Sequence, residues 1–577
     1  MTDGGVSGQP GFLAELFLGR LRCDLLQPFP EQDLEERAAG DAAVAELSEF
    51  LQRHVDPTEL DETRKLPDGL LGQLQERGFL RLPVERRLGG LALSPYNTFR
   101  AIQVAASWSP PVALILALSN GLGSAAYLPF LPEGPLREMI AARVAEGIVS
   151  GGADTEPAGA ANRLRTTTAT PVENGAAYLL NGEKIYIGNG PVADLIDVSA
   201  TLREGGREQV RLFFVDSRSP GFQVAERHEF LGLRGAPNAR LVLRNVRVPR
   251  EHMLAGDEDE WRLSPQIASM AATARIYIIG APSLAIAKLC AHWSRDFLSR
   301  RSVDGRPLGG YEQIQRMLAE SLAETFAMDS VVAWALLGAK RADTRYERVA
   351  AKNITSLTSW RIIERTLSLL GAEGYETGPS KARRGVPGLP VERFLRDARG
   401  LRIAGGVDFQ VDFWAAQAGL LACYYPADGR VPELETAGPG LTMPGLDARN
   451  SDHLAYTGAQ VTRLAQTCLE LARRYPDPEA LYAQESVVVA LGQLTRELFT
   501  MAIVLARAAH LAQQGQAEAG DLADIYCCAA RHRVEGTWLG LSASPEPDYA
   551  GVSHRWLTRR AYDSLAQDVL SKVPGLA

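Results

Sequence analysis

The sequence has few cysteines and no recognisable targeting segment. Only six of its 577 residues are cysteine, no CxxC pair occurs, and Cys527 and Cys528 are simply neighbours. No histidine stands at metal-ligand spacing from them, so we expect reduced, mostly buried thiols and no metal site. Residues 1–10 are polar and glycine-rich and lack a basic or amphipathic leader. Together these absences predict a cytoplasmic protein.

Long uninterrupted apolar runs are also missing. Residues 101–132 carry no charge, but Ser119, Asn120, Gly121 and Pro129 interrupt them. The remaining apolar run falls short of the roughly 20 residues that a membrane-spanning helix needs. We therefore expect a buried helix pair here and no transmembrane segment.

Excess positive charge is absent as well. The chain has 61 Lys and Arg against 69 Asp and Glu, and its formal charge is −8, which argues against a dedicated nucleic-acid binder. A hydrophobic content of 46% with 23% charged residues is ordinary for a globular protein. The length predicts three or four domains of about 150 residues each.

The hydrophobic periodicity changes along the chain. Helical spacing dominates at first, short β-branched and aromatic runs follow, and long helical patterns then return. A proline- and glycine-rich linker separates a last helical region. The predicted domains are an N-terminal helical domain over residues 1–148, a middle β domain over 149–258, a helix bundle over 259–425 and an additional C-terminal helical domain over 426–577.

Two local patterns make sharper predictions. Ile314, Leu318, Leu322 and Phe326 recur at every fourth position, which predicts one buried stripe on a bundle helix. Asn181-Gly182 lies between two strand-like runs. It predicts a hairpin turn, because both central residues of a type I′ turn need positive φ.

Several motifs occur in an order that resembles the acyl-CoA dehydrogenase family. They are Thr155-Glu156-Pro157, the run LNGEKIYIGNG at 180–190, LGLRG at 231–235, VRVP at 246–249 and LPVERFLRD at 389–397. The run at 11–30 and the extra C-terminal helical region are most similar to the very-long-chain branch. Each motif is weak alone, but their shared order spans nearly the whole chain.

The resemblance implies both a fold and a chemistry. The implied fold is mainly α with a small β domain: an N-terminal helical domain, a middle β-barrel and a four-helix bundle, followed here by a C-terminal helical domain. The implied activity is that of an FAD-containing oxidoreductase of fatty acid metabolism, acting on the CH–CH bond of an acyl-CoA or another acyl thioester. The implied partners are a second copy in a homodimer and an electron-transfer flavoprotein.

The residue that the family uses as a base is missing. In the family a glutamate follows the PVER motif and removes the α-proton of the thioester. Ala404 stands at that place, and Ala274, just before Arg275, stands at the alternative place used by other branches. Asp154, next to the Thr155 turn, is a weak candidate for a substitute base. A solvated turn residue or a helix cap is the interpretation that we weight more strongly for it.

The implied cofactor contacts are eroded. The resemblance places flavin contacts at Thr155, Tyr186, Ile187, Gly188, Arg300, Gly371 and Gly374. Gly188 replaces a residue whose hydroxyl resembles a donor to the flavin ring. Glu373 would bring a negative charge near a diphosphate, which is electrostatically unfavourable.

Two hypotheses of different classes follow. The first is a family flavoprotein that uses another base or a reaction that needs none. The second is a catalytically silent or repurposed paralogue that serves as a subunit or assembly protein, either as a homodimer or beside an active homologue. Acyl-thioester binding without redox chemistry is a third. Bound FAD that an acyl-CoA bleaches would separate the first hypothesis from the second.

Overall fold

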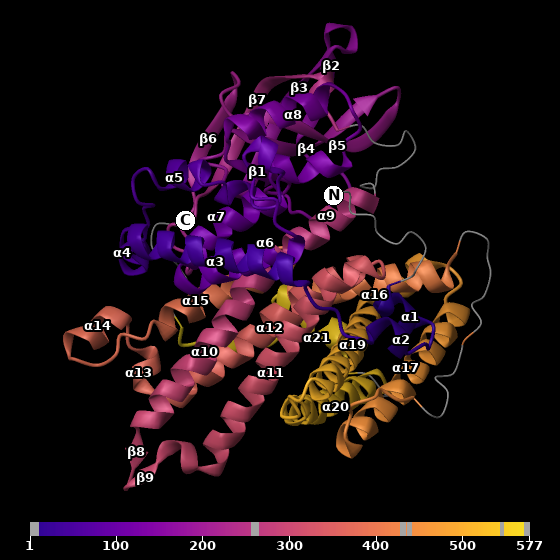
Figure 1. The fold of residues 1–577 in the computed structure, drawn as a ribbon. Coiled ribbons are helices and arrows are strands. Elements are labelled where there is room, and N and C mark those ends of the chain that lie inside the picture. Colours follow the sequence, from indigo (N-terminus) through magenta and orange to yellow (C-terminus); the bar gives the residue numbers. More distant parts are fainter. Residues whose placement is uncertain (1–10, 255–264, 427–433, 435–440, 543–546, 570–577) are drawn as a thin grey trace.

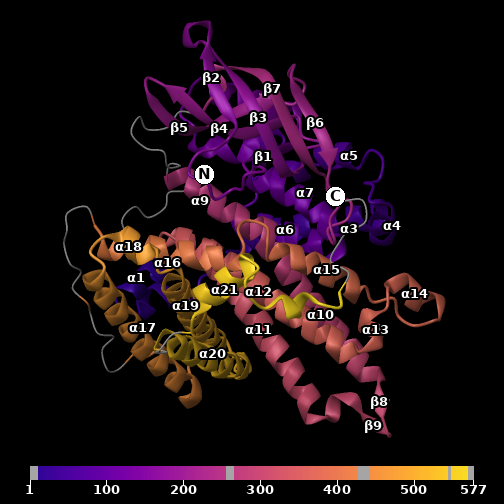
Figure 2. The same cartoon turned by 180° about the vertical axis from the view of Figure 1, so that it is seen from behind.

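The computed structural model describes residues 11–254, 265–426, 434, 441–542 and 547–569. A curled sheet stands at one end of the molecule and helices make up the rest (Figure 1; Figure 2). This is the predicted fold class, mainly α with a small β domain, a bundle and further helices at the C-terminal end.

The first helices surround one side of the sheet, with two exceptions. Their bounds are α1 Phe12–Phe17, α2 Cys23–Leu26, α3 Leu34–His54, α4 Pro57–Thr63, α5 Leu70–Glu76, α6 Pro95–Trp108, α7 Pro110–Gly121 and α8 Pro135–Glu146. Helices α3 and α6 begin at N-caps, since the side chains of Asp33 and Ser94 accept from the backbone N–H groups of Glu36 and Asn97. In contrast, α1 and α2 pack on helices from the end of the chain (Figure 1).

The sheet contains seven strands. They are β1 Ser150–Ala153, β2 Thr168–Val172, β3 Ala177–Gly188, β4 Leu195–Glu204, β5 Arg207–Asp216, β6 Phe222–Arg227 and β7 Asn238–Pro249. Their order is β1-β4-β2-β3-β7-β6, and β5 lies off this path, paired antiparallel with β4 along its whole length. The inward residues of these strands form one apolar cluster that includes Tyr178, Phe213 and Leu241.

The predicted hairpin at Asn181-Gly182 is wrong. Strand β3 runs straight through these residues, and its register against β7 shifts between Leu180 and Gly182, which marks a β-bulge. Gly182 has φ +151°, and a Cβ there would lie 2.6 Å from the Cα of Thr167. The β2–β3 turn is instead made by another Asn-Gly pair, Asn174-Gly175, where both residues have positive φ.

Long helices form the bundle beneath the sheet. They are α9 Pro265–Arg275, α10 Ala281–Arg300, α11 Glu312–Leu337, α12 Arg345–Leu370, α15 Val391–Leu401 and α16 Asp408–Tyr424, and a π-helical segment, Ile276–Gly280, joins α9 to α10. A two-stranded ribbon, β8 Ser302–Val303 and β9 Arg306–Pro307, follows α10. Short helices α13 Ala372–Tyr375 and α14 Gly378–Arg383 precede α15. The ribbon and α13 lie at the end of the bundle away from the sheet (Figure 1).

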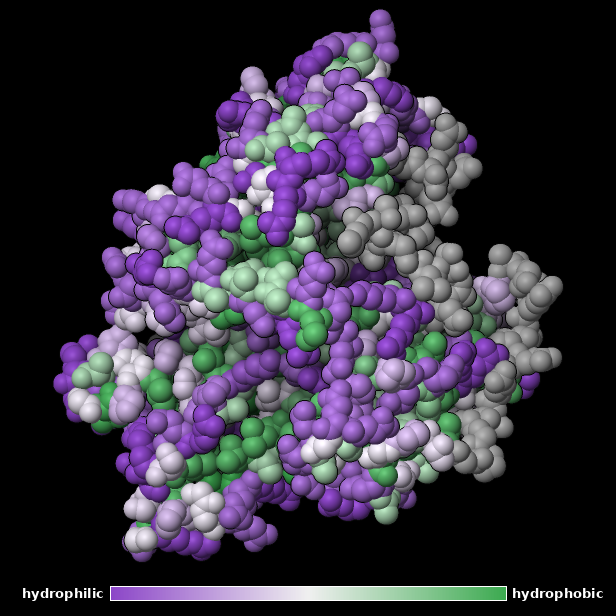
Figure 3. Space-filling model, in the orientation of Figure 1, coloured by the Kyte–Doolittle hydropathy of each residue, from purple (hydrophilic) through white to green (hydrophobic). Residues whose placement is uncertain are grey.

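The predicted buried stripe on α11 is also wrong. Leu322 is 39% exposed, and Ile314, Leu318 and Phe326 are only partly buried. The residues that α11 buries lie on a different face and include Ala323, Ala327 and Val331. Apolar surface is accordingly visible along this helix in Figure 3. Periodicity showed that one face is apolar, but it did not show whether that face meets this chain or solvent.

Five α-helices follow the bundle in the described residues. They are α17 Ala448–Arg474, α18 Pro478–Tyr482, α19 Glu485–Gln513, α20 Ala519–Ser542 and α21 Tyr549–Leu557. Of these, α17, α19 and α20 contact the bundle. Helix α19 contacts α16, α20 and α11, and Leu491, Leu498 and Leu505 on it are fully buried. Helix α19 thus uses its apolar residues for packing within this chain.

In the part of the chain that the structure describes, four helical stretches are long and apolar enough to cross a membrane by length and composition. They are Pro110–Phe130, Ile267–Arg300, Glu312–Lys340 and Glu485–Gln513. Between 72% and 78% of each apolar window is buried against the rest of the protein. Their apolar character is thus largely used in the interior.

Candidate functional site

The candidate site lies where the sheet meets the bundle. Three segments that the sequence analysis singled out are connected there: the turn at Asp154–Glu156, the end of β3 at Tyr186–Gly188 and the turn between α15 and α16. The first two are joined by the hydrogen bond from Ile185 N–H to the Thr155 carbonyl. Helices α7 and α9 link the end of β3 to the α15–α16 turn, since Leu118 of α7 lies against Gly188, α7 contacts α9, and Arg275 of α9 donates to the Gly405 carbonyl.

Asp154 is held in an ion pair rather than left free. Arg165 donates through Nε to Oδ1 at 2.8 Å and through Nη2 to Oδ2 at 3.1 Å, and the Ser199 hydroxyl donates to Oδ1 at 2.6 Å. These donors occupy both oxygens of the carboxylate. The geometry favours a structural role for Asp154.

Next to it lies a fully buried ion pair. The Lys184 ammonium on β3 donates to Glu156 Oε1 at 2.8 Å, and both side chains are 0% exposed. Glu156 also accepts from the backbone N–H groups of Thr166 and Thr167 and from the Thr166 hydroxyl. Burial raises the pKa of Glu156, but these hydrogen bonds outweigh it and lower that pKa to about 2. The pair fixes the turn that carries Thr155 against β3, where Ile185 N–H also donates to the Thr155 carbonyl.

The end of β3 carries an exposed aromatic ring next to a β-bulge. The register against β7 shifts between Lys184 and Ile187, and Tyr186 in this bulge has φ +61°. Its ring is 57% exposed and lies near those of His228 and Phe230, with centroids 5.1 and 6.2 Å away. Ile187 is buried. The site therefore offers a flat aromatic surface at this point.

Gly188 is not an empty position. A Cβ built on it would lie 2.5 Å from Cδ1 of Leu118 on α7. The space that a side chain at 188 would need is thus filled by a leucine methyl group. The loss of a hydroxyl at Gly188 is matched by an apolar contact that the sequence pattern did not predict.

Ala274 lies in a close contact between two helices. It is 1% exposed, and a Cβ built on Gly121 of α7 would lie 3.1 Å from the Ala274 Cβ. A carboxylate base at position 274 would have to displace this contact. The π-helical segment begins two residues later at Ile276, and such segments are frequent at functional sites.

Arg275 points from α9 toward the α15–α16 turn. Its Nε donates to the Gly405 carbonyl at 3.3 Å and its Nη1 to the Ala271 carbonyl at 3.2 Å. Burial lowers the pKa of Arg275, and the charge of Asp154 acts in the opposite direction. Arg275 therefore interacts with two turns: its charge interacts with Asp154 in one turn, and its guanidinium donates to the turn that contains Ala404.

The α15–α16 turn is exposed at Ala404 and supported from below by a lysine. Residues 401–406 include no carboxylate, and a Cβ built on Gly405 would face Arg275 Cγ at 3.7 Å and Ile279 at 3.9 Å. The buried Lys352 donates to the carbonyls of Gly406 at 2.6 Å and Arg402 at 3.2 Å. Burial lowers the pKa of Lys352 to about 8.

Asp408, the other acidic residue near this turn, is engaged by Arg402. The Arg402 guanidinium donates to Asp408 Oδ2. Burial raises the pKa of Asp408, but Arg402 outweighs it and the pKa is lowered. Asp408 is thus a salt-bridge partner rather than a spare base.

The residues expected at the adenylate end of a flavin form a second cluster. Arg300 Nη2 lies 3.0 Å from Glu373 Oε2, and Arg301 lies 3.7 Å from the other oxygen. Gly371 (φ +56°) and Gly374 flank this glutamate. The charge of Glu373 is therefore met by two arginines within the chain. This cluster lies at the far end of α10, whose 20 residues span about 30 Å, away from Tyr186 and Thr155 (Figure 1).

Sequence reasoning missed the supporting groups. Lys184 was visible as part of a motif, but its buried contact with Glu156 was not predicted. Lys352 carries no local signal at all, because it meets the turn at Gly406 through tertiary contact. Lys381 is likewise held by tertiary contact, since it is buried and donates to the Glu373 carbonyl at 2.7 Å.

Comparison with known families supports the same assignment along the chain. Models of the acyl-CoA dehydrogenase N-terminal, middle and C-terminal domains match residues 39–131, 152–246 and 266–410. Together these ranges cover more than half of the chain.

Individual relatives agree. A probable acyl-CoA dehydrogenase, FadE10, of Mycobacterium tuberculosis is 31% identical over 403 residues, which is 69% of this chain and 61% of that protein. The chain thus spans less than two thirds of that relative. The mitochondrial very long-chain specific acyl-CoA dehydrogenase of Mus musculus is 24% identical over 575 residues, 93% of this chain and 84% of its own.

Solved structures show the same fold. An acyl-CoA dehydrogenase of Bacillus anthracis, complexed with FAD, superposes with a TM-score of 0.75 at 19% identity and covers 96% of both chains. Butyryl-CoA dehydrogenase of Megasphaera elsdenii covers 67% of this chain and 98% of its own, with a TM-score of 0.59 at 23% identity. Given three ordered domain matches and this architecture, the chain belongs to the acyl-CoA dehydrogenase family.

Proposed function

We propose that this protein is an FAD-dependent oxidoreductase that acts on an acyl thioester and lacks the usual carboxylate base. The observation that carries the proposal is the position of Arg275, whose Nε donates to the Gly405 carbonyl of the α15–α16 turn at 3.3 Å and whose charge interacts with that of Asp154 in the other turn. The family resemblance puts the flavin ring and the thioester at this junction.

The chain's residues fit the ring half of FAD. The exposed Tyr186 ring and the bulged backbone beside it offer a stacking surface and backbone polar groups. The buried Lys184–Glu156 pair holds the Thr155 turn in place. When bound, FAD would supply hydride acceptance, which no side chain of the protein can perform.

The missing base distinguishes this site. Asp154 and Asp408 are engaged by arginines, and Ala274 is enclosed by α7. Without a carboxylate base, a second candidate function is a silent or repurposed subunit, and this candidate holds if the protein binds no FAD or if its FAD does not react. In an active protein, backbone groups of the site would polarise the thioester carbonyl and orient the substrate.

Spectroscopy of the purified protein tests the proposal. The protein as isolated, and after incubation with FAD, is examined for a bound-flavin spectrum and for bleaching by a long-chain acyl-CoA. Flavin that is bound and bleached supports the oxidoreductase and refutes the silent subunit. Failure to bind FAD after reconstitution refutes the oxidoreductase.

Restoring a carboxylate tests the base. Ala404→Glu and Gly405→Glu place an acid on the turn, with Ala404→Gln as the uncharged control. We expect one of the two acids to raise the bleaching rate in flavin-loaded protein, since Ala404 is exposed and the Gly405 side faces Arg275. Equal rates in all variants would contradict a simple lost-base account.

A homodimer is part of the proposal. The Arg300 cluster lies at the C-terminal end of α10, at the end of the bundle away from the sheet that carries Tyr186 (Figure 1), so one chain does not bring the two to the same end of the molecule. The apolar stripe on α11 offers a surface that a second copy or an active homologue would cover (Figure 3). Leu322→Glu should shift the mass in light scattering toward the monomer, whereas Leu539→Glu on α20, also exposed, should not.

The acyl chain length, an electron-transfer flavoprotein as acceptor and cytoplasmic localisation stay predictions from the sequence. The first two become testable once flavin bleaching is measured. A panel of acyl-CoA chain lengths, with and without an electron-transfer flavoprotein, addresses both.

A further inference from the structure

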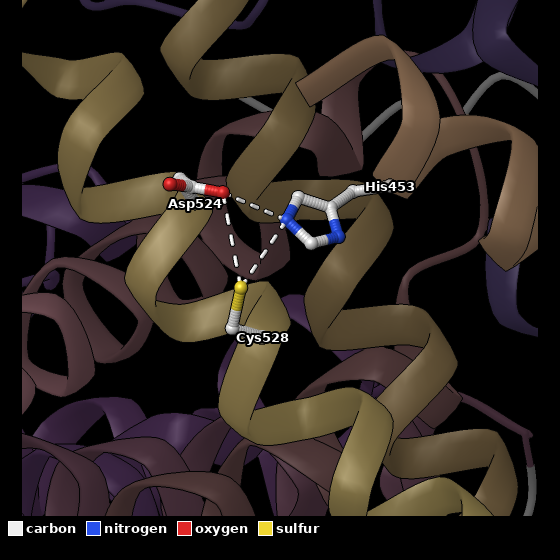
Figure 4. Close-up of side chains that lie close together, drawn as sticks. All are labelled: His453, Asp524 and Cys528. Atoms are coloured by element: carbon white, nitrogen blue, oxygen red, sulfur yellow. Dashed lines mark hydrogen bonds and ion pairs between the residues drawn. The ribbon is translucent and has the colours of Figure 1, made fainter. Parts of the chain in front are cut away.

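Three potential metal ligands meet on the C-terminal helices, far from the flavin junction. His453 lies on α17, and Asp524 and Cys528 lie one turn apart on α20 (Figure 4). His453 Nε2 lies 3.0 Å from Asp524 Oδ1, and Cys528 Sγ lies 3.7 Å from His453 Nε2 and 3.8 Å from Asp524 Oδ1. The three ligand atoms thus form a compact triangle.

The size of this triangle matches one face of a zinc tetrahedron. With Zn–N and Zn–O bonds of about 2.0 Å and a Zn–S bond of about 2.3 Å, tetrahedral angles separate N from O by about 3.3 Å and S from either by about 3.5 Å. Each observed separation agrees with its ideal value to within about 0.3 Å. A small relaxation of the side chains would therefore admit the ion.

The same residue types could also form a nucleophilic triad, but the geometry argues against it. In a triad the carboxylate bonds one imidazole nitrogen and the nucleophile approaches the other. Here Asp524 and Cys528 both approach Nε2 (Figure 4). Nδ1 of His453 is buried and makes no hydrogen bond in the described part of the chain. The side chains converge on a point, as ligands do, rather than forming a relay.

The surrounding charges leave the ligand atoms available. Arg449 on α17 binds the other carboxylate oxygen, Asp524 Oδ2, at 2.9 Å. Its own charge is offset by Asp521 at 3.1 Å and Asp447 at 3.8 Å. Among the contacts of the described residues, Oδ1 therefore faces only His453 and Cys528, and the guanidinium fixes the orientation of the carboxylate from outside.

The three ligand residues differ in solvent exposure. His453 is 4% exposed, whereas Cys528 is exposed. Burial and the charge of Asp524 raise the pKa of the Cys528 thiol, so an incoming ion must displace its proton. The exposed side provides an entry path and room for water as a fourth ligand.

We propose that His453, Asp524 and Cys528 bind one Zn²⁺ ion that ties α17 to α20. The mixed nitrogen, oxygen and sulfur donors suit Zn²⁺ and disfavour Mg²⁺ or Ca²⁺, which prefer oxygen. Because both helices pack on α19, the ion would stabilise the C-terminal helices and leave the flavin junction unchanged.

Metal titration of the full-length protein tests this proposal. The protein is stripped with a chelator, and Zn²⁺ is added in competition with a chromophoric chelator. In parallel, Co²⁺ is added to detect a thiolate-to-cobalt charge-transfer band. We expect one Zn²⁺ per chain and a cobalt band that requires Cys528. Cys528→Ser and Asp524→Asn should each weaken zinc binding at least tenfold, and Cys423→Ser is the matched control.

The outcomes are distinct. Cys528→Ser replaces an exposed thiol, so its fold is expected to survive, and circular dichroism verifies this. Zinc that binds wild type and Cys528→Ser equally, a cobalt band that persists in that variant, or no zinc uptake by the stripped protein would each overturn the proposal. Loss of the band in Cys528→Ser together with its retention in Cys423→Ser would support it. Neither result depends on FAD binding.

Discussion

The buried Lys184–Glu156 pair allows a sharp prediction about the β domain. Lys184→Met removes the ammonium but keeps an apolar stem of similar length. Glu156 would then remain buried with only the hydrogen bonds from Thr166 and Thr167. Leaving one member of a buried pair uncompensated costs about 3–5 kcal/mol, so we expect Lys184→Met to lose stability on that scale.

The pH dependence gives an independent estimate of the stability that the ionised Glu156 contributes. The pKa of Glu156 is lowered from 4.5 to about 2, and this shift corresponds to about 3 kcal/mol. Because the folded pKa lies below the unfolded one, this stability is present above about pH 4.5 and is lost as the pH falls toward 2. Glu156→Gln should remove this part of the acid sensitivity.

The assay is urea unfolding combined with hydrogen exchange of the β1–β3 amides, since the domains of a long chain need not unfold together. Wild type, Lys184→Met, Glu156→Gln and the double variant form a cycle. We expect the double variant to be more stable than Lys184→Met, because it leaves no unpaired buried charge. A coupling energy below about 1 kcal/mol, or a Lys184→Met variant as stable as wild type, would refute the reasoning.

Three further predictions concern the core and the junction. Burial raises the pKa of Glu347 to about 7, so its ionisation destabilises the fold as the pH rises from about 4.5 to 7. Glu347→Gln should therefore raise the melting temperature at pH 8 but not at pH 4.5. Equal gains at both pH values would contradict this. Ala274→Glu should lower the free energy of unfolding by several kcal/mol, since it buries a charge against α7, whereas the exposed Ala404→Glu should change it by less than about 0.5 kcal/mol; denaturant melts compare the two. Gly188→Thr should lower the melting temperature, because its side chain would overlap with that of Leu118. The double variant with Leu118→Ala should lose less, and an equal loss in the double variant would exclude this contact as the cause.

Short motifs identified the segments of the candidate site. Thr155, Tyr186 and the turn at Ala404 were all identified in the sequence, and the structure connects them through α7 and α9. Their supports were not predictable, because each acts through a tertiary contact: Leu118 fills the space beside Gly188, Gly121 encloses Ala274, and distant arginines engage the acidic residues. The roles of these residues toward a flavin stay predictions.

The sequence by itself determined the family and the order of helical and strand regions, because both depend on local periodicity and on motifs read along the chain. Only the tertiary structure decided which Asn-Gly pair forms the turn of the β2–β3 hairpin. The same dipeptide can form a hairpin turn or a β-bulge, and the choice depends on which strand pairs with the residues around it. The tertiary structure also decided that the α11 stripe lies at the surface, because an apolar face does not specify what covers it. Finally, it brought His453 within reach of Cys528, 75 residues away in the chain, because ligands on packed helices have no fixed spacing in sequence.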